Sequence, residues 1–208
     1  MILASAAPRL ENGDHLSRQS FEDLYHEYHK YYSHQAELIE GVVYMTPPVR
    51  AYQHARPHAL VVAWLVAFEA KCNDGKERVM VLDNASVRLD WHNEPQPDVL
   101  LRYTQGQSYV DEDDYVVGPP ELVVEIAASS ASYDLFEKKT IYQRSGVKEY
   151  LVWQISENRL TWWHLVEGSY VALQPDTQGL IHSPSFPGLC LDQAALLQGN
   201  ITKVLASL

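Results

Sequence analysis

The sequence predicts an α/β or α+β domain in which helices pack on a central mixed β-sheet. Helical and β-branched segments follow one another in the order helix, hairpin, helix, several strands, helix and strands, which is typical of such a sheet. Of the 208 residues, 46% are hydrophobic and 21% are charged, an ordinary balance for a protein with a buried core. We expect one domain over residues 19–208. Residues 1–18 mix Pro, Gly, Asn, Asp and Ser, and predict a loose tail.

Capping residues and apolar periodicity predict four helices. Ser20 is a candidate N-cap for the first helix. Leu60, Trp64 and Phe68 recur at helical spacing and predict a long, largely buried second helix. Gly146 closes the third helix. The predicted helices span residues 21–31, 53–72, 134–145 and 192–197.

Runs of β-branched and aromatic residues between turn residues predict the strands. Glu40-Gly41 lies between two such runs and favours a hairpin. The polar, acidic segment 104–118 reads as a loop. The predicted strands span residues 36–39, 42–46, 79–82, 85–89, 97–103, 122–127, 149–155, 160–166 and 170–173.

Charge and composition exclude several classes of protein. The formal charge is 16 − 27 = −11, which argues against a protein that coats nucleic acid without specificity. It does not exclude catalysis on nucleic acid through a local basic patch. No apolar run approaches the roughly 20 residues of a membrane helix, so we expect no membrane partner. Two widely spaced cysteines, Cys72 and Cys190, give no disulfide framework and favour a reducing cytoplasm.

Two acids stand in segments that otherwise favour burial. Asp98 opens an apolar run in 96–101, and Glu125 lies inside another in 121–127. Burying a carboxylate costs several kcal/mol unless a cation or hydrogen bonds compensate. A hard cation such as Mg²⁺ takes oxygen ligands and keeps several waters. Asp98, Glu125 and the backbone carbonyl of Ile126 would leave room for water and a phosphate oxygen.

Lys138, near the start of the third helix, supplies an amine to such a site. It would orient or deprotonate an attacking water, or neutralise charge that develops on a phosphate. Structural interpretations compete with this one. An Asp that begins a strand is commonly a cap or turn residue, and a strand Glu often lies in a salt bridge. Asp134 and Lys138, at i and i+4, form a favourable helix pair in their own right.

Seven motifs occur in order between about Phe21 and Val166. They are Glu37-Leu38-Ile39-Glu40-Gly41, Pro47-Pro48, His54, Gln96-Pro97-Asp98-Val99, Pro120-Glu121-Leu122-Val123-Val124-Glu125-Ile126, Asp134 with Lys138 and Tyr142, and Gly146-Val147-Lys148-Glu149-Tyr150. No single motif is specific. The ordered set resembles the Uma-type endonuclease family, within the restriction-endonuclease-like PD-(D/E)xK superfamily.

The resemblance implies a restriction-endonuclease-like core, with a central mixed β-sheet flanked by α-helices and the site at one sheet edge. It implies Mg²⁺- or Mn²⁺-dependent hydrolysis of phosphodiester bonds, with DNA as the partner. By motif, Asp98 is the Pro-Asp acid, Glu125 is the acid of the E-x-K element, and Glu37 is the accessory acid. Asp98, Glu125 and the Ile126 carbonyl are the implied metal ligands.

The chain departs from the superfamily pattern at Ala127, where a lysine should stand. The Uma-type pattern places a lysine on the following helix, and Lys138 matches that position. His54 matches a histidine at the start of the long helix, although its spacing from Pro47-Pro48 is about two residues longer than usual. Asp134 is a further accessory candidate.

Partner contacts are predicted from basic and aromatic residues. The densest basic stretch, which includes Lys139, Arg144 and Lys148, is either an ordinary helix face or the place where a phosphate backbone approaches. Trp162 and Trp163 point to opposite faces of a strand, so one belongs to the core and the other is covered by a partner or the tail. With the family's analogy, this favours a homodimer.

Three functions follow from the sequence. The first is a Mg²⁺-dependent endonuclease that acts on DNA. The second is a nuclease-like domain that no longer cuts and serves as a binding or assembly module, which the charge of −11 and the displaced lysine favour. The third is hydrolysis of a small phosphoester, which would reconcile an acidic surface with the same site.

Overall fold

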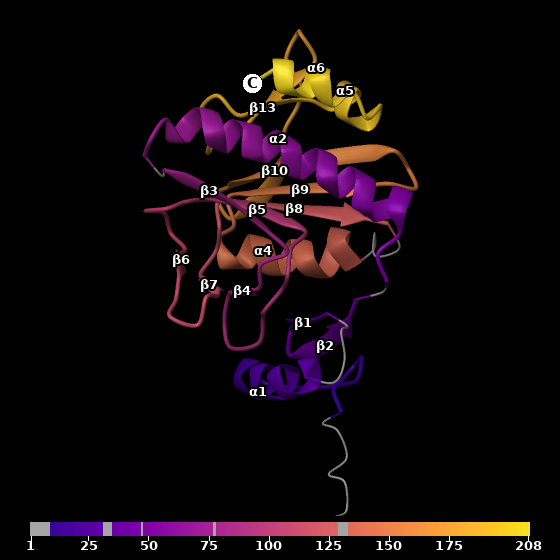
Figure 1. Cartoon of the computed structure of the whole chain (residues 1–208), viewed down its shortest axis with the longest axis vertical. Coiled ribbons are helices and arrows are strands. Elements are labelled where there is room, and N and C mark those ends of the chain that lie inside the picture. Colours follow the sequence, from indigo (N-terminus) through magenta and orange to yellow (C-terminus); the bar gives the residue numbers. More distant parts are fainter. Residues whose placement is uncertain (1–8, 31–34, 47, 77, 129–132) are drawn as a thin grey trace, which may run out of the picture.

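A six-stranded mixed sheet forms the centre of the molecule (Figure 1). The computed structural model describes residues 9–30, 35–46, 48–76, 78–128 and 133–208. The strand order is β11-β10-β9-β8-β5-β3; β8 and β9 are parallel, and the other neighbours are antiparallel. The strands are β3 (Val79–Asp83), β5 (Val99–Tyr103), β8 (Leu122–Ala127), β9 (Glu149–Gln154), β10 (Arg159–Val166) and β11 (Ser169–Ala172). The predicted fold class is confirmed.

Helices cover both faces of this sheet (Figure 1). The long helix α2 (Arg56–Asn73) lies on one face with the C-terminal helices α5 (Gln193–Leu197) and α6 (Ile201–Ala206). The short helix α4 (Lys139–Ser145) lies on the other face. Single π-helical turns, η1 (Ala51–Ala55) and η2 (Asp134–Lys138), precede α2 and α4. Such turns are rare and occur frequently at functional sites.

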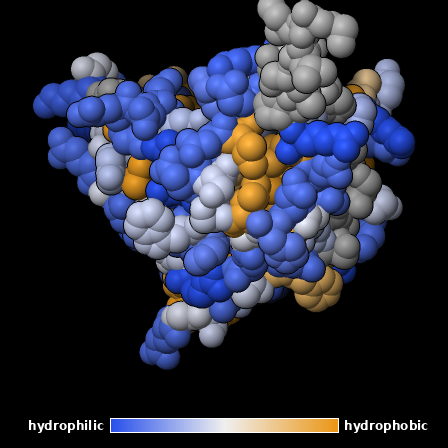
Figure 2. Space-filling model, turned by 90° about the horizontal axis from the view of Figure 1, so that it is seen from below, coloured by the Kyte–Doolittle hydropathy of each residue, from blue (hydrophilic) through white to orange (hydrophobic). Residues whose placement is uncertain are grey.

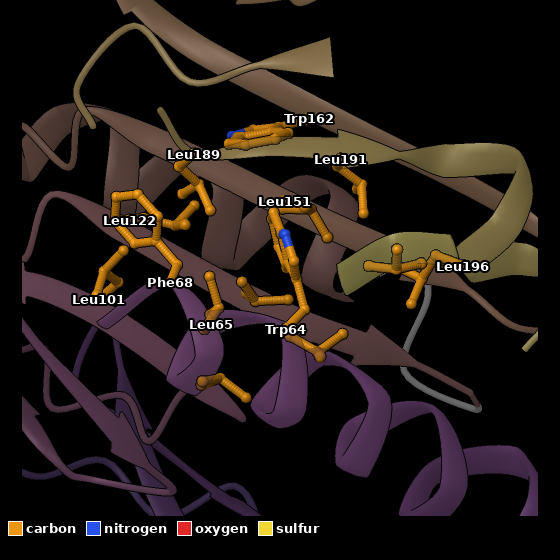
Figure 3. Close-up of a cluster of buried hydrophobic side chains, with 14 of the residues drawn as sticks. Trp64, Leu65, Phe68, Leu101, Leu122, Leu151, Trp162, Leu189, Leu191 and Leu196 are labelled. Carbon is orange, nitrogen blue, oxygen red and sulfur yellow. The ribbon is translucent and has the colours of Figure 1, made fainter. Parts of the chain in front are cut away.

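The larger core fills the space between α2 and the sheet (Figure 3). Trp64, Leu65 and Phe68 project from α2 and are at most 2% exposed. They meet Leu151 and Trp162 on the central strands, and the C-terminal segment closes the cluster from the opposite side. Area burial of this kind supplies most of the favourable free energy of folding. The periodicity that predicts a buried helix here is therefore confirmed.

A separate small layer lies below the sheet in the view of Figure 1. It consists of the helix α1 (Arg18–His29) and the hairpin formed by β1 (Ala36–Ile39) and β2 (Val42–Met45). Seen from below, hydrophilic residues surround a narrow apolar strip (Figure 2). Residues 9–17 are not loose, because Leu10 is buried and the Gly13 N–H donates to the Val43 carbonyl at 2.8 Å.

The first helix begins earlier than the sequence predicts. Its N-cap is Ser17, whose hydroxyl accepts a hydrogen bond from the Ser20 N–H at 3.3 Å. Both serines satisfy capping chemistry, and sequence alone does not rank them. The predicted end at Tyr31 lies outside the described residues.

Several short elements escape prediction. The expected loop 104–118 contains β6 (Tyr109–Val110) and β7 (Val116–Val117), which form a small sheet with β4 (Val87–Arg88). A second pair, β12 (Leu180–His182) and β13 (Cys190–Asp192), and the helix α6 were also missed. Two- and three-residue strands carry too little periodicity to detect, and distant pairing creates them.

Both strand tryptophans are buried. Trp162 is 1% exposed and Trp163 is 9% exposed, the latter stacked on Tyr150. The expectation that a partner or the N-terminal tail covers one of them is therefore wrong, because Tyr150 and Lys139 of the domain itself contact Trp163. The tryptophans no longer support a homodimer. Within the described part of the chain, no helix has the length and apolar character needed to cross a membrane.

Candidate functional site

Asp98 lies where β5 stops pairing with β8. The ladder ends at Val99 and Val124, so the last residues of β8 extend past β5. Asp98 occupies this edge, and its Oδ2 accepts a hydrogen bond from the Ile126 N–H at 2.6 Å. The Ala127 carbonyl accepts from Ile155 on the β9 side. Because backbone groups alternate along a strand, the Ile126 carbonyl faces the Asp98 side.

Glu125 is a buried acid on the α4 face of the same strand, 3% exposed. Its Oε1 accepts hydrogen bonds from Lys138 Nζ at 3.1 Å and from the Tyr142 hydroxyl at 3.0 Å. Ala127 lies two residues further along the same face. Its methyl group leaves the space that a long side chain from the helix can enter.

Lys138 joins carboxylates from three different elements. Its Nζ lies 2.8 Å from Glu37 Oε1 on β1, 3.1 Å from Glu125 Oε1 on β8 and 3.8 Å from Asp134 Oδ1 on η2. The Lys138 side chain is 6% exposed, and the acids are 4% exposed. Glu37 Oε1 also accepts from the Gln96 N–H at 2.7 Å, which ties β1 to the segment before Asp98.

The electrostatics of this cluster favour an additional cation. Burial raises the pKa of Glu125 well above its usual value, although Lys138 opposes the shift. Burial would lower the pKa of Lys138, but Glu125, Glu37 and Asp134 together raise it well above its usual value. Three buried carboxylates thus share one ammonium group. Ionisation of all three would leave an excess of negative charge, which is costly in a buried site.

Two histidines, His54 on η1 and His58 near the start of α2, contact Asp98 from the other side. His54 Nε2 lies 2.8 Å from Asp98 Oδ1, and this hydrogen bond raises the pKa of His54. His58 Nε2 lies 3.0 Å from the Asp98 carbonyl and 2.8 Å from Asp83 Oδ1. Sequence reasoning missed His58, although its i+4 spacing from His54 puts both rings on one helix face.

The structure thus brings Glu37, Glu125, Asp134 and Lys138 into direct contact, with Asp98 and His54 on the neighbouring edge. Tyr142 was missed as a site residue, although it belongs to the helix motif. A phenol inside a helix is ordinarily part of the core. The one sequence signal was its i+4 spacing from Lys138, which places both side chains over β8.

The three basic residues predicted to bind nucleic acid lie in other environments. Lys139 Nζ sits 4.1 Å from the centre of the Trp163 ring. Arg144 pairs with Glu40 and Asp90, and Lys148 Nζ lies 3.8 Å from Glu121 Oε1. Each of the three therefore has a partner within the fold, which favours the helix-face interpretation.

Among the described residues, no three His, Cys, Asp or Glu side chains converge closely enough to hold a metal ion by themselves. A site of two carboxylates and a backbone carbonyl does not require three such side chains. Mg²⁺ keeps several waters and commonly uses one or two carboxylates. Asp98, Glu125 and the Ile126 carbonyl supply oxygen donors, which is the kind of ligand that a hard cation takes.

A mixed sheet with one acid on β8, another just before β5 and a lysine beside them is the arrangement expected of a nuclease-like domain. The sequence matches the Uma2 family, described as "Putative restriction endonuclease", over residues 21–194, and the chain belongs to this family. This confirms the resemblance found in the sequence motifs.

A solved structure with a similar fold is the crystal structure of a "putative nuclease belonging to DUF820" from Anabaena variabilis ATCC 29413. The TM-score is 0.62 at 13% sequence identity, and the match covers 79% of this chain and 90% of that chain. At this identity the likeness concerns the fold alone. A comparison with curated proteins finds no match.

Proposed function

We propose that this protein is a divalent-metal-dependent nuclease that hydrolyses phosphodiester bonds in DNA, with Mg²⁺ or Mn²⁺ as the metal. One observation carries the proposal: Lys138 Nζ, from the helix, lies 3.1 Å from Glu125 Oε1, on the strand where Ala127 replaces the expected lysine. A displaced lysine thus supplies the amine of the E-x-K element. Membership of the Uma2 family, described as "Putative restriction endonuclease", supports the same reaction class.

Asp98, Glu125 and the Ile126 carbonyl would hold the metal. A bound divalent ion would polarise a phosphate oxygen and lower the pKa of a coordinated water. The negative excess around Lys138 supports this assignment, because a cation beside Asp98 and Glu125 would offset it. His54 holds the Asp98 carboxylate through Oδ1, which fixes the orientation of that ligand.

Lys138 acts in this proposal as a charged donor rather than as a base. Its pKa is held well above its usual value by the surrounding carboxylates, so the amine carries its proton at neutral pH. A charged amine orients a water and stabilises negative charge on a phosphate oxygen, but it does not accept a proton. Glu37 positions this amine at 2.8 Å, and the Tyr142 hydroxyl positions Glu125.

The test is cleavage of supercoiled plasmid DNA with Mg²⁺ or Mn²⁺. Asp98→Asn and Glu125→Gln keep the shape of each side chain and remove its charge, and Lys138→Ala removes the amine. We expect each variant to lose at least about 100-fold in rate. Asp113→Asn, on an exposed loop, is the control and should cut like the wild type. Equal cleavage by Asp98→Asn, Lys138→Ala and wild type would overturn the assignment.

The closed state of the cluster supports a second candidate, a nuclease-like binding or assembly module that no longer cuts. Glu37 and Glu125 both contact Lys138, and the three side chains are at most 6% exposed. Calorimetric titration with Mn²⁺ separates the two functions, because the module predicts no heat of binding at millimolar metal. Hydrolysis of bis(4-nitrophenyl) phosphate without plasmid cleavage would favour a small phosphoester as substrate.

A further inference from the structure

The segment that runs from β2 through η1 into α2 differs in charge from the rest of the chain. Residues 41–68 contain no Asp or Glu, although the whole chain has 27 of them and a formal charge of −11. The same segment contains Arg50 and Arg56 together with the site histidines His54 and His58. The two arginines of this stretch are cations that attract phosphates to the site.

The π-helical turn η1 points its residues in two directions. His54 turns inward to Asp98, while Tyr52 is 87% exposed. Arg50 and Arg56 are also exposed, and neither takes part in an ion pair with any of the described residues. Arg50 Nη1 donates a hydrogen bond to Gln53 Oε1 at 3.1 Å. The turn and its two flanking arginines thus present to solvent one aromatic ring and two guanidinium groups that lack acidic partners among the described residues.

A second exposed ring comes from η2. Phe136 is 67% exposed and stands two residues before Lys138. The helix α2 begins at the end of the sheet where β8 ends, and so does η2, the turn that continues into α4 (Figure 1). His54 of η1 contacts Asp98, Asp98 accepts from the Ile126 N–H, and the neighbouring Glu125 contacts Lys138 of η2. The two π-turns therefore flank one site.

A lone exposed aromatic residue needs no explanation. Here two exposed rings and two arginines without acidic partners border a candidate phosphodiester site, whereas the basic residues of the α4 region are paired elsewhere. Aromatic rings that stack on bases, combined with cations that contact phosphates, are the usual means of binding single-stranded nucleic acid. Base faces inside a duplex are covered by their neighbours, so stacking a ring there first costs unstacking energy, whereas an unpaired base offers its face directly.

We propose that Arg50, Tyr52, Arg56 and Phe136 form a rim that binds unpaired DNA nucleotides beside the scissile phosphate. This inference rests on the proposed nuclease function and narrows its substrate to DNA with a single-stranded segment. Tyr52 and Phe136 stack on bases, and Arg50 and Arg56 contact the flanking phosphates. The net charge of −11 agrees with a short contact of this kind, since a long duplex footprint needs many cations.

Fluorescence anisotropy tests the rim with a fluorescein-labelled 15-nucleotide DNA, used alone or annealed to its complement. EDTA is present, so that metal-dependent cleavage does not interfere. We expect the single strand to bind more tightly than the duplex. Tyr52→Ala and Phe136→Ala should each weaken single-strand binding about 5- to 100-fold. Arg50→Ala and Arg56→Ala should each reduce the slope of log K against log salt by about 0.7.

Matched controls come from the opposite end of the sheet. Tyr109 is 58% exposed on β6, and Arg78 is an exposed arginine without an acidic partner among the described residues. Tyr109→Ala and Arg78→Ala should bind the single strand like the wild type. Since all of the substituted side chains are exposed, loss of folding should not confuse the comparison, and thermal melting checks this.

Two results would overturn the proposal. One is that the wild type binds single strand and duplex with equal affinity and that Tyr52→Ala binds DNA as the wild type does. Plasmid cleavage in that case would leave the proposed nuclease function standing. The other is a change of sedimentation coefficient in Tyr52→Ala without a change in DNA binding, which would make the rim a protein interface. Conversely, rim-dependent binding of the single strand without any cleavage would support the rim and contradict the nuclease function.

Discussion

Replacing Lys138 with methionine removes the ammonium group from the buried carboxylates of Glu37, Glu125 and Asp134. Loss of one partner from a buried ion pair costs about 3–5 kcal/mol. Two acids lie within 3.1 Å of Nζ and the lysine side chain is 6% exposed, so we expect a value in this range at pH 8. For a chain of 208 residues this lowers Tm by roughly 6–20 °C.

The loss should depend on pH. Burial raises the pKa of Glu125 and Lys138 opposes this rise, so without the lysine the folded-state pKa of Glu125 moves further above that of an unfolded-chain Glu, which is about 4.3. The folded state then binds more protons than the unfolded state, so the stability of the variant falls as pH rises. We therefore expect a smaller loss at pH 5 than at pH 8, measured by urea unfolding at both values.

A matched control and a rescue make this prediction refutable. Lys203→Met removes an ion pair with Asp192 at 2.9 Å, but Lys203 is 64% exposed, so stability should change little. Adding Glu125→Gln to Lys138→Met removes one of the stranded charges and should recover part of the loss. The reasoning is refuted if Lys138→Met is as stable as Lys203→Met at pH 8, or if its loss does not grow with pH.

Three further predictions concern stability. Leu151→Ala, in the fully buried core, should cost about 2–5 kcal/mol by urea unfolding, whereas Ala at exposed Val171 should cost little. Burial and a hydrogen bond with Glu22 raise the pKa of Glu94 to about 9. The free energy of unfolding of the wild type should therefore fall as pH rises from about 4.5 to 9. Glu94→Gln should remove this pH dependence and be more stable than the wild type at about pH 8. Gly146→Ala should cost about 1 kcal/mol, because φ is +86° at this position; the added Cβ meets no atom within 4 Å, so the cost comes from the backbone conformation alone. A melting temperature equal to that of the wild type would contradict this.

Much of the fold follows from local patterns in the sequence. The central strands β8 and β9 and the buried face of α2 were predictable, because each combines a long apolar run with clear turn or cap residues. The strands β6, β7, β12 and β13 were not, since each has two or three residues and exists through pairing with distant segments. The packed segment 9–17 depends on contacts with β2 that its polar composition does not reveal.

The candidate site was predictable in its acids and less so in its contacts. Asp98 and Glu125 stand out because carboxylates interrupt apolar runs. The contact between Lys138 and Glu37 depends on how the hairpin β1–β2 packs below the sheet. No local sequence pattern encodes this packing. The same limit explains why the basic residues were misleading as a predicted DNA contact. They are close together in the sequence, but the fold gives each of Lys139, Arg144 and Lys148 its own partner.

The central claim is that Asp98, Glu125 and Lys138 form one metal-dependent hydrolytic site. A crystal structure of the protein soaked in Mn²⁺ tests it most directly, because the anomalous signal of manganese locates the ion without reference to any mechanism. The account predicts a peak bonded to Asp98, Glu125 and the Ile126 carbonyl, with Lys138 beside it. Saturating Mn²⁺ with no peak at these atoms, and the Glu37–Lys138–Glu125 contacts unchanged, would contradict it.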